Sequence, residues 1–409
     1  MFKKQSAVLW QEEHTLSNKP YQLVQQEVDQ LEEKIRSHRL KILKLTIFLI
    51  MLALIVCGVL YFLYETRSYS DFQVLESTER QDSVGTSFLE FKGNILKYGN
   101  DGIFYIDAKN QLIWNQTYEM QSPQVDTCGD YVAVADQKGK KIYIMNVSGP
   151  CGEIDTNRPI RQVHVANQGM VAVLMEEDGI GYIQLYDKKG SFLAEGEMHA
   201  KNSGYPLDIA ISDDGKKMAA VMLDINEGEV RTTVAFSNFG SVGQNEIDNI
   251  VSSYPYSDTM ITKVEFLTND IAVALGDNRL VLYEGKQKPV VKKEIAIDRE
   301  IRSVFYNDNY IGLVFDADNE DTPFCMEVYD VRGSKVRSID FAMEYDEIGF
   351  LGNDEICIRN NLECSIYTLR GTKRFHYNFE KDICKVIHTR GRQYLFLMSG
   401  ATERVKLKQ

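Results

Sequence analysis

Proline, tryptophan, histidine and cysteine are scarce in this chain of 409 residues, which has eight, two, six and seven of them respectively. The few prolines leave strands free to pair, because proline cannot donate to a β-ladder. Seven cysteines in a chain of this length are too few for a disulfide-dense scaffold. The histidines after residue 65 have no His or Cys neighbour at the spacing of a zinc site (His164, His199, His376, His388).

Catalytic motifs are also missing. The chain has no Gly-x-Ser-x-Gly, no His-Glu-x-x-His and no phosphate-binding loop. The Gly-Ser-Val-Gly stretch at 240–243 is followed by Gln-Asn and is interpreted as a turn. We therefore expect no enzyme activity, no cofactor and no bound metal, with one weak exception considered below.

Basic residues are fewer than acidic residues. The chain has 46 Lys and Arg against 59 Asp and Glu, for a net charge of −13. Residues 1–64 hold eight basic and six acidic side chains, so residues 65–409 carry −15. Such a segment repels nucleic acid, whose binding proteins present basic faces, and we expect no nucleic-acid partner. The acidity is typical of a domain that charge keeps soluble.

One segment has no charge at all. Leu45 to Tyr64 is a run of 20 uncharged residues, LTIFLIMLALIVCGVLYFLY, with an aromatic belt at its end. A helix of this length spans about 30 Å, the thickness of the bilayer core. The pattern predicts a transmembrane helix over 45–64. A buried core helix is the alternative.

The charges that flank this segment predict its orientation. Five basic residues lie within 34–44, whereas only Arg67 follows closely, beside Glu65 and Asp71. The positive-inside rule then puts residues 1–44 in the cytoplasm and residues 65–409 outside the cell membrane. A cleaved signal peptide fits poorly, because the leader is long and no small-x-small site ends the apolar run.

After Asp71 the chain reads as short strands separated by turns. Val, Ile, Tyr and Phe alternate with polar residues in segments such as 131–136 and 170–175, and Asn-Asp, Asp-Gly and Gly-Asn pairs fall between them. No long helical period appears after residue 64. This part of the chain is expected to be all-β.

The strands repeat with a period of about 35–50 residues. Each repeat runs strand, turn, very apolar strand, turn, strand with an aromatic end, Gly-containing turn and edge strand, as in 264–287 and 348–374. Four strands per repeat are typical of a β-propeller blade. The repeats begin near Phe88, Pro123, Pro159, Tyr205, Thr259, Glu300, Met343 and Lys381. Eight starts favour eight blades, and seven is the alternative.

The first and last repeats predict how the ring closes. The segment 381–409 has three clear strands, and a strand at 72–77 would supply its fourth. The expected domains are thus a cytoplasmic tail (1–44), a transmembrane helix (45–64), a linker with the closing strand (65–87) and a propeller (88–409).

The repeats resemble quinone-dehydrogenase-like and WD40-like propeller blades. As a whole, the chain resembles a family of single-pass membrane proteins of Gram-positive anaerobes with an outer propeller. The stretches that carry this resemblance are 91–120 (FKGNILKYGNDGIFYIDAKNQLIWNQTYEM), 234–251 (VAFSNFGSVGQNEIDNIV) and 303–316 (SVFYNDNYIGLVFD). The resemblance covers about residues 70–409 and implies the architecture. It does not indicate an activity.

The tail has its own pattern. Apolar residues at spacings of three and four form an a/d seam on a helix over about 21–42 (Tyr21, Val24, Val28, Leu31, Ile35). We expect Val24, Val28, Leu31 and Ile35 to support a homodimer through the tail. An amphipathic helix on the inner leaflet or on a partner is the alternative.

Two local patterns suggest cross-links or ligands. In EICIRNNLECSIY, a two-residue turn at Asn360-Asn361 would put Cys357 opposite Cys364, within disulfide reach. Free thiols are the alternative. The acidic loop 316–321 and Glu327, twelfth in the count, form a weak Ca²⁺ candidate, although a solvated hairpin tip is favoured. The candidate ligands are Asp316, Asp318, Glu320 and Glu327.

The longest irregular stretch, 237–258, is the candidate contact surface, because rim loops of propellers are exposed and long loops carry function. Its candidate partner-binding residues are Gln244, Asn245, Tyr254 and Tyr256. We therefore expect a non-enzymatic binding or scaffold domain for a protein, a peptide or a cell-wall component. The alternatives are a ligand sensor that signals through tail dimerisation and a propeller enzyme that acts on quinones or glycans.

Overall fold

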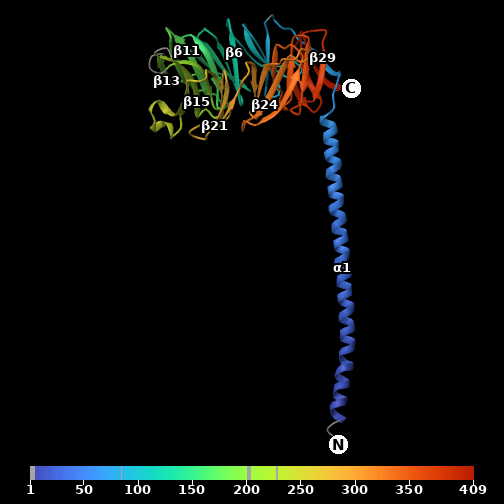
Figure 1. Cartoon of the computed structure of the whole chain (residues 1–409). Coiled ribbons are helices and arrows are strands. Elements are labelled where there is room, and N and C mark those ends of the chain that lie inside the picture. The colour runs from blue at the N-terminus through green and yellow to red at the C-terminus, as the bar shows by residue number, and fades with distance from the viewer. Residues whose placement is uncertain (1–4, 84, 200–203, 227–228) are drawn as a thin grey trace. The chain divides into compact units, whose positions relative to one another are not determined.

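The computed structural model of the chain describes residues 5–83, 85–199, 204–226 and 229–409. It divides into two compact units, Met1–Arg67 and Ser68–Gln409 (Figure 1). The first unit is a single helix, α1, over Gln5–Glu65. The described residues of the second form strands joined by loops, with two short 3-10 turns.

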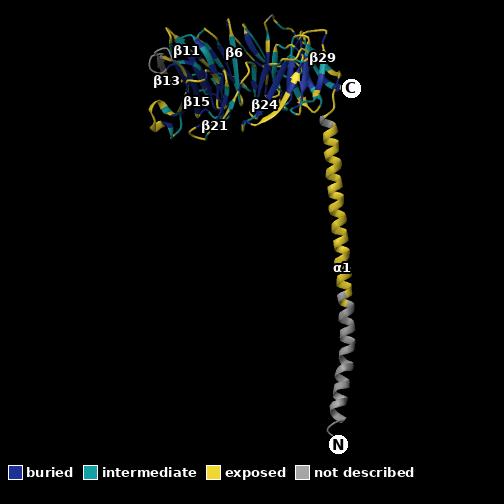
Figure 2. Ribbon diagram, in the orientation of Figure 1, coloured by how far each residue is buried: buried dark blue, intermediate teal, exposed yellow. Residues whose placement is uncertain are grey.

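Helix α1 contains the one segment of the described chain that is long and apolar enough to cross a membrane, Gln30–Leu63. Its described side chains, including Val28, Leu31 and Ile35 of the expected seam, are exposed (Figure 2). The side chain of Val24 lies outside the described residues. The predicted N-terminal apolar helix is confirmed, and it fits a single-pass anchor.

Ser68–Gln409 forms eight four-stranded antiparallel sheets. Blade 1 consists of β2 (Ser87–Phe91), β3 (Asn94–Gly99), β4 (Gly102–Ile106) and β5 (Leu112–Thr117). Blade 2 consists of β6 (Pro123–Cys128), β7 (Tyr131–Asp136), β8 (Lys141–Asn146) and β9 (Gly149–Asp155). Blade 3 consists of β10 (Ile160–Val165), β11 (Val171–Glu177), β12 (Ile180–Tyr186) and β13 (Phe192–His199). Blades 4 and 5 consist of β14 (Tyr205–Ile211), β15 (Lys217–Asn226), β16 (Glu229–Asn238), β17 (Ile250–Tyr256); and β18 (Ile261–Thr268), β19 (Ile271–Gly276), β20 (Arg279–Glu284), β21 (Val290–Ala296).

Blades 6 and 7 consist of β22 (Ile301–Tyr306), β23 (Tyr310–Asp316), β24 (Phe324–Asp330), β25 (Lys335–Phe341); and β26 (Glu347–Phe350), β27 (Ile356–Arg359), β28 (Glu363–Tyr367), β29 (Lys373–Asn378). Blade 8 consists of β30 (Ile383–Arg390), β31 (Gln393–Met398), β32 (Ala401–Lys408) and β1 (Asp71–Glu79). The eight-bladed propeller is confirmed, and seven blades are excluded.

The ring closes through the sheet that joins the two ends of the propeller. Strand β1 pairs antiparallel with β32, from Asp71 opposite Lys408 to Glu79 opposite Ala401. The closing strand expected at 72–77 is present and longer at both ends. Pairing the first strand with the last removes the free edges that an open ring would present.

The core lies between neighbouring blades, because each large cluster of buried apolar residues draws on two adjacent sheets, and the strands of the propeller are accordingly coloured as buried in Figure 2. Strand β11 shows why the second strand of each repeat is so apolar: its first five residues, Val171 to Met175, are fully buried because blades cover both of its faces. Several first strands of neighbouring sheets contact one another, namely β6 with β10, β10 with β14, β14 with β18, β22 with β26 and β30 with β2. These inner strands therefore surround the axis of the ring.

Candidate functional site

A cavity of about 250 Å³ lies in the central channel, where the inner strands of blades 2 to 6 end. Asp126, His164 and Glu265 occupy equivalent positions on β6, β10 and β18, each one directly after a valine that packs into the core. The Val165 backbone N–H donates to Asp126 Oδ2 at 2.7 Å. The Tyr306 hydroxyl donates to Glu265 Oε2 at 2.7 Å.

The surroundings of these carboxyl groups change their acidity. Burial raises the pKa of Asp126 and of Glu265, because the channel wall desolvates their charged forms. The imidazole of His164, whose Nδ1 lies 3.9 Å from Asp126 Oδ2, opposes this shift. Asp126 still exposes 32 % of its side chain. Groups with a shifted pKa in an open cavity mark a candidate functional site.

Cys128, Asp213 and Asp308 also line this cavity. Burial, and then the nearby Asp213 carboxylate, raise the pKa of Cys128 to about 12. The thiol is therefore protonated at neutral pH and is a poor nucleophile. Within the described residues, no group of three His, Cys, Asp or Glu side chains is arranged to hold a metal ion.

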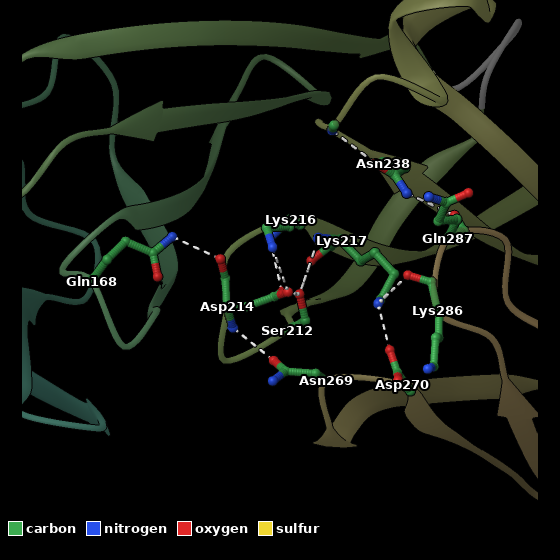
Figure 3. Close-up of polar contacts among 11 residues, drawn as sticks. Gln168, Ser212, Asp214, Lys216, Lys217, Asn238, Asn269, Asp270, Lys286 and Gln287 are labelled. Atoms are coloured by element: carbon green, nitrogen blue, oxygen red, sulfur yellow. Dashed lines mark hydrogen bonds and ion pairs between the residues drawn. The ribbon is translucent and has the colours of Figure 1, made fainter.

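Hydrogen bonds from both neighbouring blades hold the turn that carries Asp213 (Figure 3). The side-chain amide of Gln168, from blade 3, donates to the Asp214 carbonyl at 2.9 Å. The backbone N–H of Asp214 donates to Asn269 Oδ1, from blade 5, at 2.7 Å. Within the turn, the Ser212 hydroxyl donates to Asp214 Oδ1 at 2.8 Å. The turn that brings Asp213 to the cavity is thus held in place by three adjacent blades.

Lys217 ties blade 4 to blade 5 beside this turn (Figure 3). Its ammonium group donates to Asp270 Oδ1 at 3.0 Å and to the Lys286 carbonyl at 2.8 Å. Only 2 % of the Lys217 side chain is exposed. A lysine is buried in this way only when its charge is paired and hydrogen-bonded, so this contact is structural.

A second cavity, an apolar groove of about 320 Å³, lies between blades 3 and 4. Small residues explain why it is open. Ala194 and Gly196 of β13 face Met218 and Met222 of β15 across the groove, and a Cβ built on Gly196 would meet nothing within 4 Å. The other apolar residues that line the groove are Ile183, Leu185, Phe239 and Ile250.

The connection between β16 and β17, residues 239–249, borders this groove and contains the 3-10 turns η1 (Gly243–Asn245) and η2 (Ile247–Asn249). Asp248 and Asn249 have φ of +54° and +58°, a left-handed conformation that costs about 1 kcal/mol or more for each such residue. Ile247 is 86 % exposed, although burying such a side chain is worth about 1.5–3 kcal/mol. The loop therefore keeps an aliphatic side chain in water beside an open apolar groove.

The structure separates the four residues expected to bind a partner. Gln244 and Asn245 are exposed on the loop. Tyr254 and Tyr256 instead belong to β17, and both pack into the interface between blades 4 and 5. The Tyr256 hydroxyl lies 2.7 Å from that of Tyr283. The irregular stretch is thus shorter than expected, because an edge strand with alternating tyrosines takes up residues 250–256.

The four Ca²⁺ candidates are not brought together. Glu327 lies on β24 opposite Leu313, away from the hairpin tip that holds Asp318 and Glu320. It is ion-paired with Arg299 and with Lys335. Asp316 accepts a hydrogen bond from Arg302 at 3.0 Å.

Cys357 and Cys364 are free thiols with their sulfur atoms 3.6 Å apart. The ladder pairs Cys364 with Arg359, and Cys357 with Ile366. The two cysteines are therefore diagonal neighbours rather than directly opposite. The reason is the turn, which lies at 361–362, one residue further along than expected, because Asn360 pairs with Glu363.

Sequence reasoning missed the channel residues Asp126, His164 and Glu265. Their signal is a polar residue directly after the core valine of an inner strand, which becomes visible only when the repeats are aligned on their first strands. It also missed the groove, which depends on small residues of one blade facing long residues of the next.

Known proteins share the fold. The crystal structure of Sqt1 from Saccharomyces cerevisiae is 10 % identical, with a TM-score of 0.54, and covers 84 % of this chain and 100 % of its own. Sqt1 from Chaetomium thermophilum, bound to the N-terminus of the ribosomal protein L10, is 11 % identical with the same TM-score, and covers 83 % and 100 %. BamB from Moraxella catarrhalis is 8 % identical, with a TM-score of 0.49, and covers 82 % and 100 %. No curated protein sequence matches the chain.

Residues 65–407 match the profile of DUF5711, described as a family of unknown function. The chain belongs to this family. The match covers the propeller and confirms the resemblance that the repeats suggested.

Proposed function

We propose that this member of the DUF5711 family is a membrane-anchored, non-enzymatic binding domain whose propeller receives a protein partner at its rim. The observation that carries the proposal is the apolar groove between blades 3 and 4, with the exposed Ile247 beside it. Exposed apolar side chains beside a groove are typical of surfaces that a partner covers.

Fold neighbours support the same class of function. The Chaetomium thermophilum Sqt1 propeller binds the N-terminus of a ribosomal protein. An eight-bladed ring of packed sheets is a rigid platform that presents loops without moving them. A similar fold supports only the class of function. The chemistry of the partner has to be inferred from the residues of the groove.

The proposal also anchors this platform in a membrane. The uncharged run 45–64, within the candidate span Gln30–Leu63, would cross the bilayer, and the basic residues before that run would keep residues 1–44 in the cytoplasm. The acidic residues 65–409 then lie outside the cell. In this proposal, the seam of Val24, Val28, Leu31 and Ile35 pairs two copies of the chain through their tails.

The test is in-cell crosslinking of the full-length chain followed by mass spectrometry, beside a chain that lacks residues 1–44. A partner that crosslinks to 239–250 in both chains supports the proposal. Crosslinks confined to the tail, with none to the propeller, would contradict it and favour a ligand sensor.

The channel favours one second candidate, a glycan-acting enzyme, because two carboxyl groups with a raised pKa face the same cavity as His164. Glycosidases use such carboxyl pairs. The test is release of reducing ends from purified cell-wall polysaccharide by the full chain and by Glu265→Gln. Equal release from the two proteins, or none, rules this candidate out.

A further inference from the structure

We infer that the groove between blades 3 and 4 binds an extended segment of a partner protein that carries an aliphatic anchor residue flanked by lysine or arginine. This inference rests on the proposed function and names the partner's chemistry.

The shape of the groove requires an inserted apolar side chain. Its lining includes the aliphatic and sulfur-bearing side chains of Ile183, Leu185, Met218 and Met222, and no heavy atom lies within 4 Å of a Cβ built on Gly196. The polar residues of the same lining are Glu195, Ser237, Asp248 and Asn249. Methionine side chains are flexible and adapt to different aliphatic guests. One leucine- or isoleucine-sized side chain is therefore the natural occupant.

The border of the groove selects the charge of the segment. The two border segments, 191–196 and 239–250, contain Glu195, Glu246 and Asp248 and no Lys or Arg. Glu195 is paired with Arg158 at 3.0 Å, whereas Glu246 and Asp248 have no ion pair among the described residues. Two carboxylates without a counter-charge at the border of an apolar groove complement a cationic residue beside the anchor.

The same charges disfavour a second copy of the chain in the groove. A twofold contact would bring Glu246 and Asp248 of both copies together, between propellers that each carry net negative charge. Exposed Ile247 would fit such a contact by size but not by the charge around it. The occupant is therefore a different, basic protein.

The backbone of β13 explains why the segment is extended. Strand β13 is the outermost strand of blade 3, so one of its edges has no neighbouring strand among the described residues. Residues 191–196 are exposed throughout, and Ala194 and Gly196 of this stretch line the groove. A strand added to this edge directs alternate side chains into the groove.

The probe is a fluorescein-labelled heptapeptide of alternating lysine and isoleucine, measured by fluorescence anisotropy. It is added to the full chain in nanodiscs of neutral phosphatidylcholine, so that the lipid does not attract it. Two matched peptides replace lysine with glutamate or isoleucine with serine. We expect each replacement to weaken binding about tenfold or more.

Gly196→Leu fills the groove at a position with free space, so the fold is expected to tolerate it. Gly352→Leu is the control, because Gly352 is exposed in blade 7 and a Cβ there also meets nothing within 4 Å. Binding is expected to fall about tenfold in Gly196→Leu and to stay within about twofold in Gly352→Leu. Hydrogen exchange is expected to slow in residues 192–196 when the lysine peptide is added.

Other results would overturn the inference. Equal binding by Gly196→Leu, or protection at the acidic channel instead of β13, would show that the peptide uses another surface. Dimers of the propeller that Ile247→Asp dissolves would assign the groove to a second copy. If the crosslinked partner of the cell persists in Gly196→Leu, this inference fails while the proposed function stands. If no partner crosslinks to the propeller at all, both fail.

Discussion

The hydroxyl of Tyr306 donates a 2.7 Å hydrogen bond to Glu265 across the boundary between blades 5 and 6. The bond stabilises a carboxylate that the channel wall otherwise desolvates, and burial still keeps the pKa of Glu265 above its ordinary value. The contact shows how the inner strands fix side chains around the axis, and it leads to a testable pH dependence.

Glu265→Gln is expected to stabilise the propeller at neutral pH. Below the ordinary pKa of glutamate, the group is protonated in the folded and the unfolded chain and costs nothing. As the pH rises toward the higher folded pKa, the unfolded chain loses the proton first, so the free energy of unfolding falls. Glutamine removes this loss and keeps the acceptor for Tyr306.

Thermal unfolding at pH 4 and pH 7.5 checks this. We expect a higher free energy of unfolding than in the unsubstituted chain at pH 7.5, and a difference that shrinks at pH 4. The exposed-tip variant Glu320→Gln is the control and should shift neither value. A gain that is larger at pH 4 would contradict the assignment.

Lys217→Met is expected to weaken the tie between blades 4 and 5. It leaves Asp270 and the Lys286 carbonyl without the ammonium that they bind, at a cost of about 1.5 kcal/mol, because water can still reach the partly exposed Asp270. Lys216→Met is the control, because that side chain is 71 % exposed and should change stability by about 0.5 kcal/mol or less. Equal stability of the two variants in urea unfolding would contradict a structural role for Lys217.

Arg80→Met is expected to destabilise the contact between blades 8 and 1, where the ring closes. Arg80 is ion-paired with Asp82 at 2.8 Å, donates to the Met398 carbonyl at 2.8 Å and to Thr402 Oγ1 at 2.6 Å, and stacks on Phe88. It therefore joins blade 8 to blade 1, and its loss should cost roughly 3 kcal/mol.

Limited proteolysis at the seam provides the readout. Cleavage between 66 and 86 should be faster in Arg80→Met than in Arg332→Met, whose side chain is 77 % exposed. Similar cleavage rates in the two variants would show that β1 alone holds the ring closed.

Cys357 and Cys364 are expected to resist alkylation in the folded protein. Hydrogen bonding to Cys357 and burial raise the pKa of Cys364, and both side chains are buried. Iodoacetamide at pH 8 should label both only after denaturation. A native peptide pair two mass units lighter than the two thiols would show a disulfide and refute the free-thiol arrangement.

The repeat period made most of the fold predictable. Pro123 and Tyr205, two of the expected repeat starts, are the first residues of β6 and β14. Turn pairs and alternating apolar residues are local signals, so one sequence is enough to read them. The strand at 72–77 was predictable as well, because the last repeat had three clear strands and needed a fourth.

The candidate site was predictable only in part. The loop at 239–249 stands out in the sequence, but Tyr254 and Tyr256 gave no sign that they face the next blade rather than water. The groove is lined by small residues of one blade, such as Gly196, and by long residues of the next, such as Met222, and no local pattern encodes this combination. Cys364 was expected directly opposite Cys357 because the turn was predicted one residue too early. A shift of the turn changes every pair in the hairpin.

The most direct test of the account places a photo-crosslinking amino acid at Ile247 of the full-length chain in its host cells, and at Leu112 as the control. Leu112 is also an exposed aliphatic residue, 58 % exposed on β5 of blade 1. We predict one protein crosslinked at position 247, absent at 112 and lost when Gly196→Leu is added. No crosslink at 247, or the same crosslinks at both positions, would contradict the claim that this propeller binds a protein at the groove between blades 3 and 4.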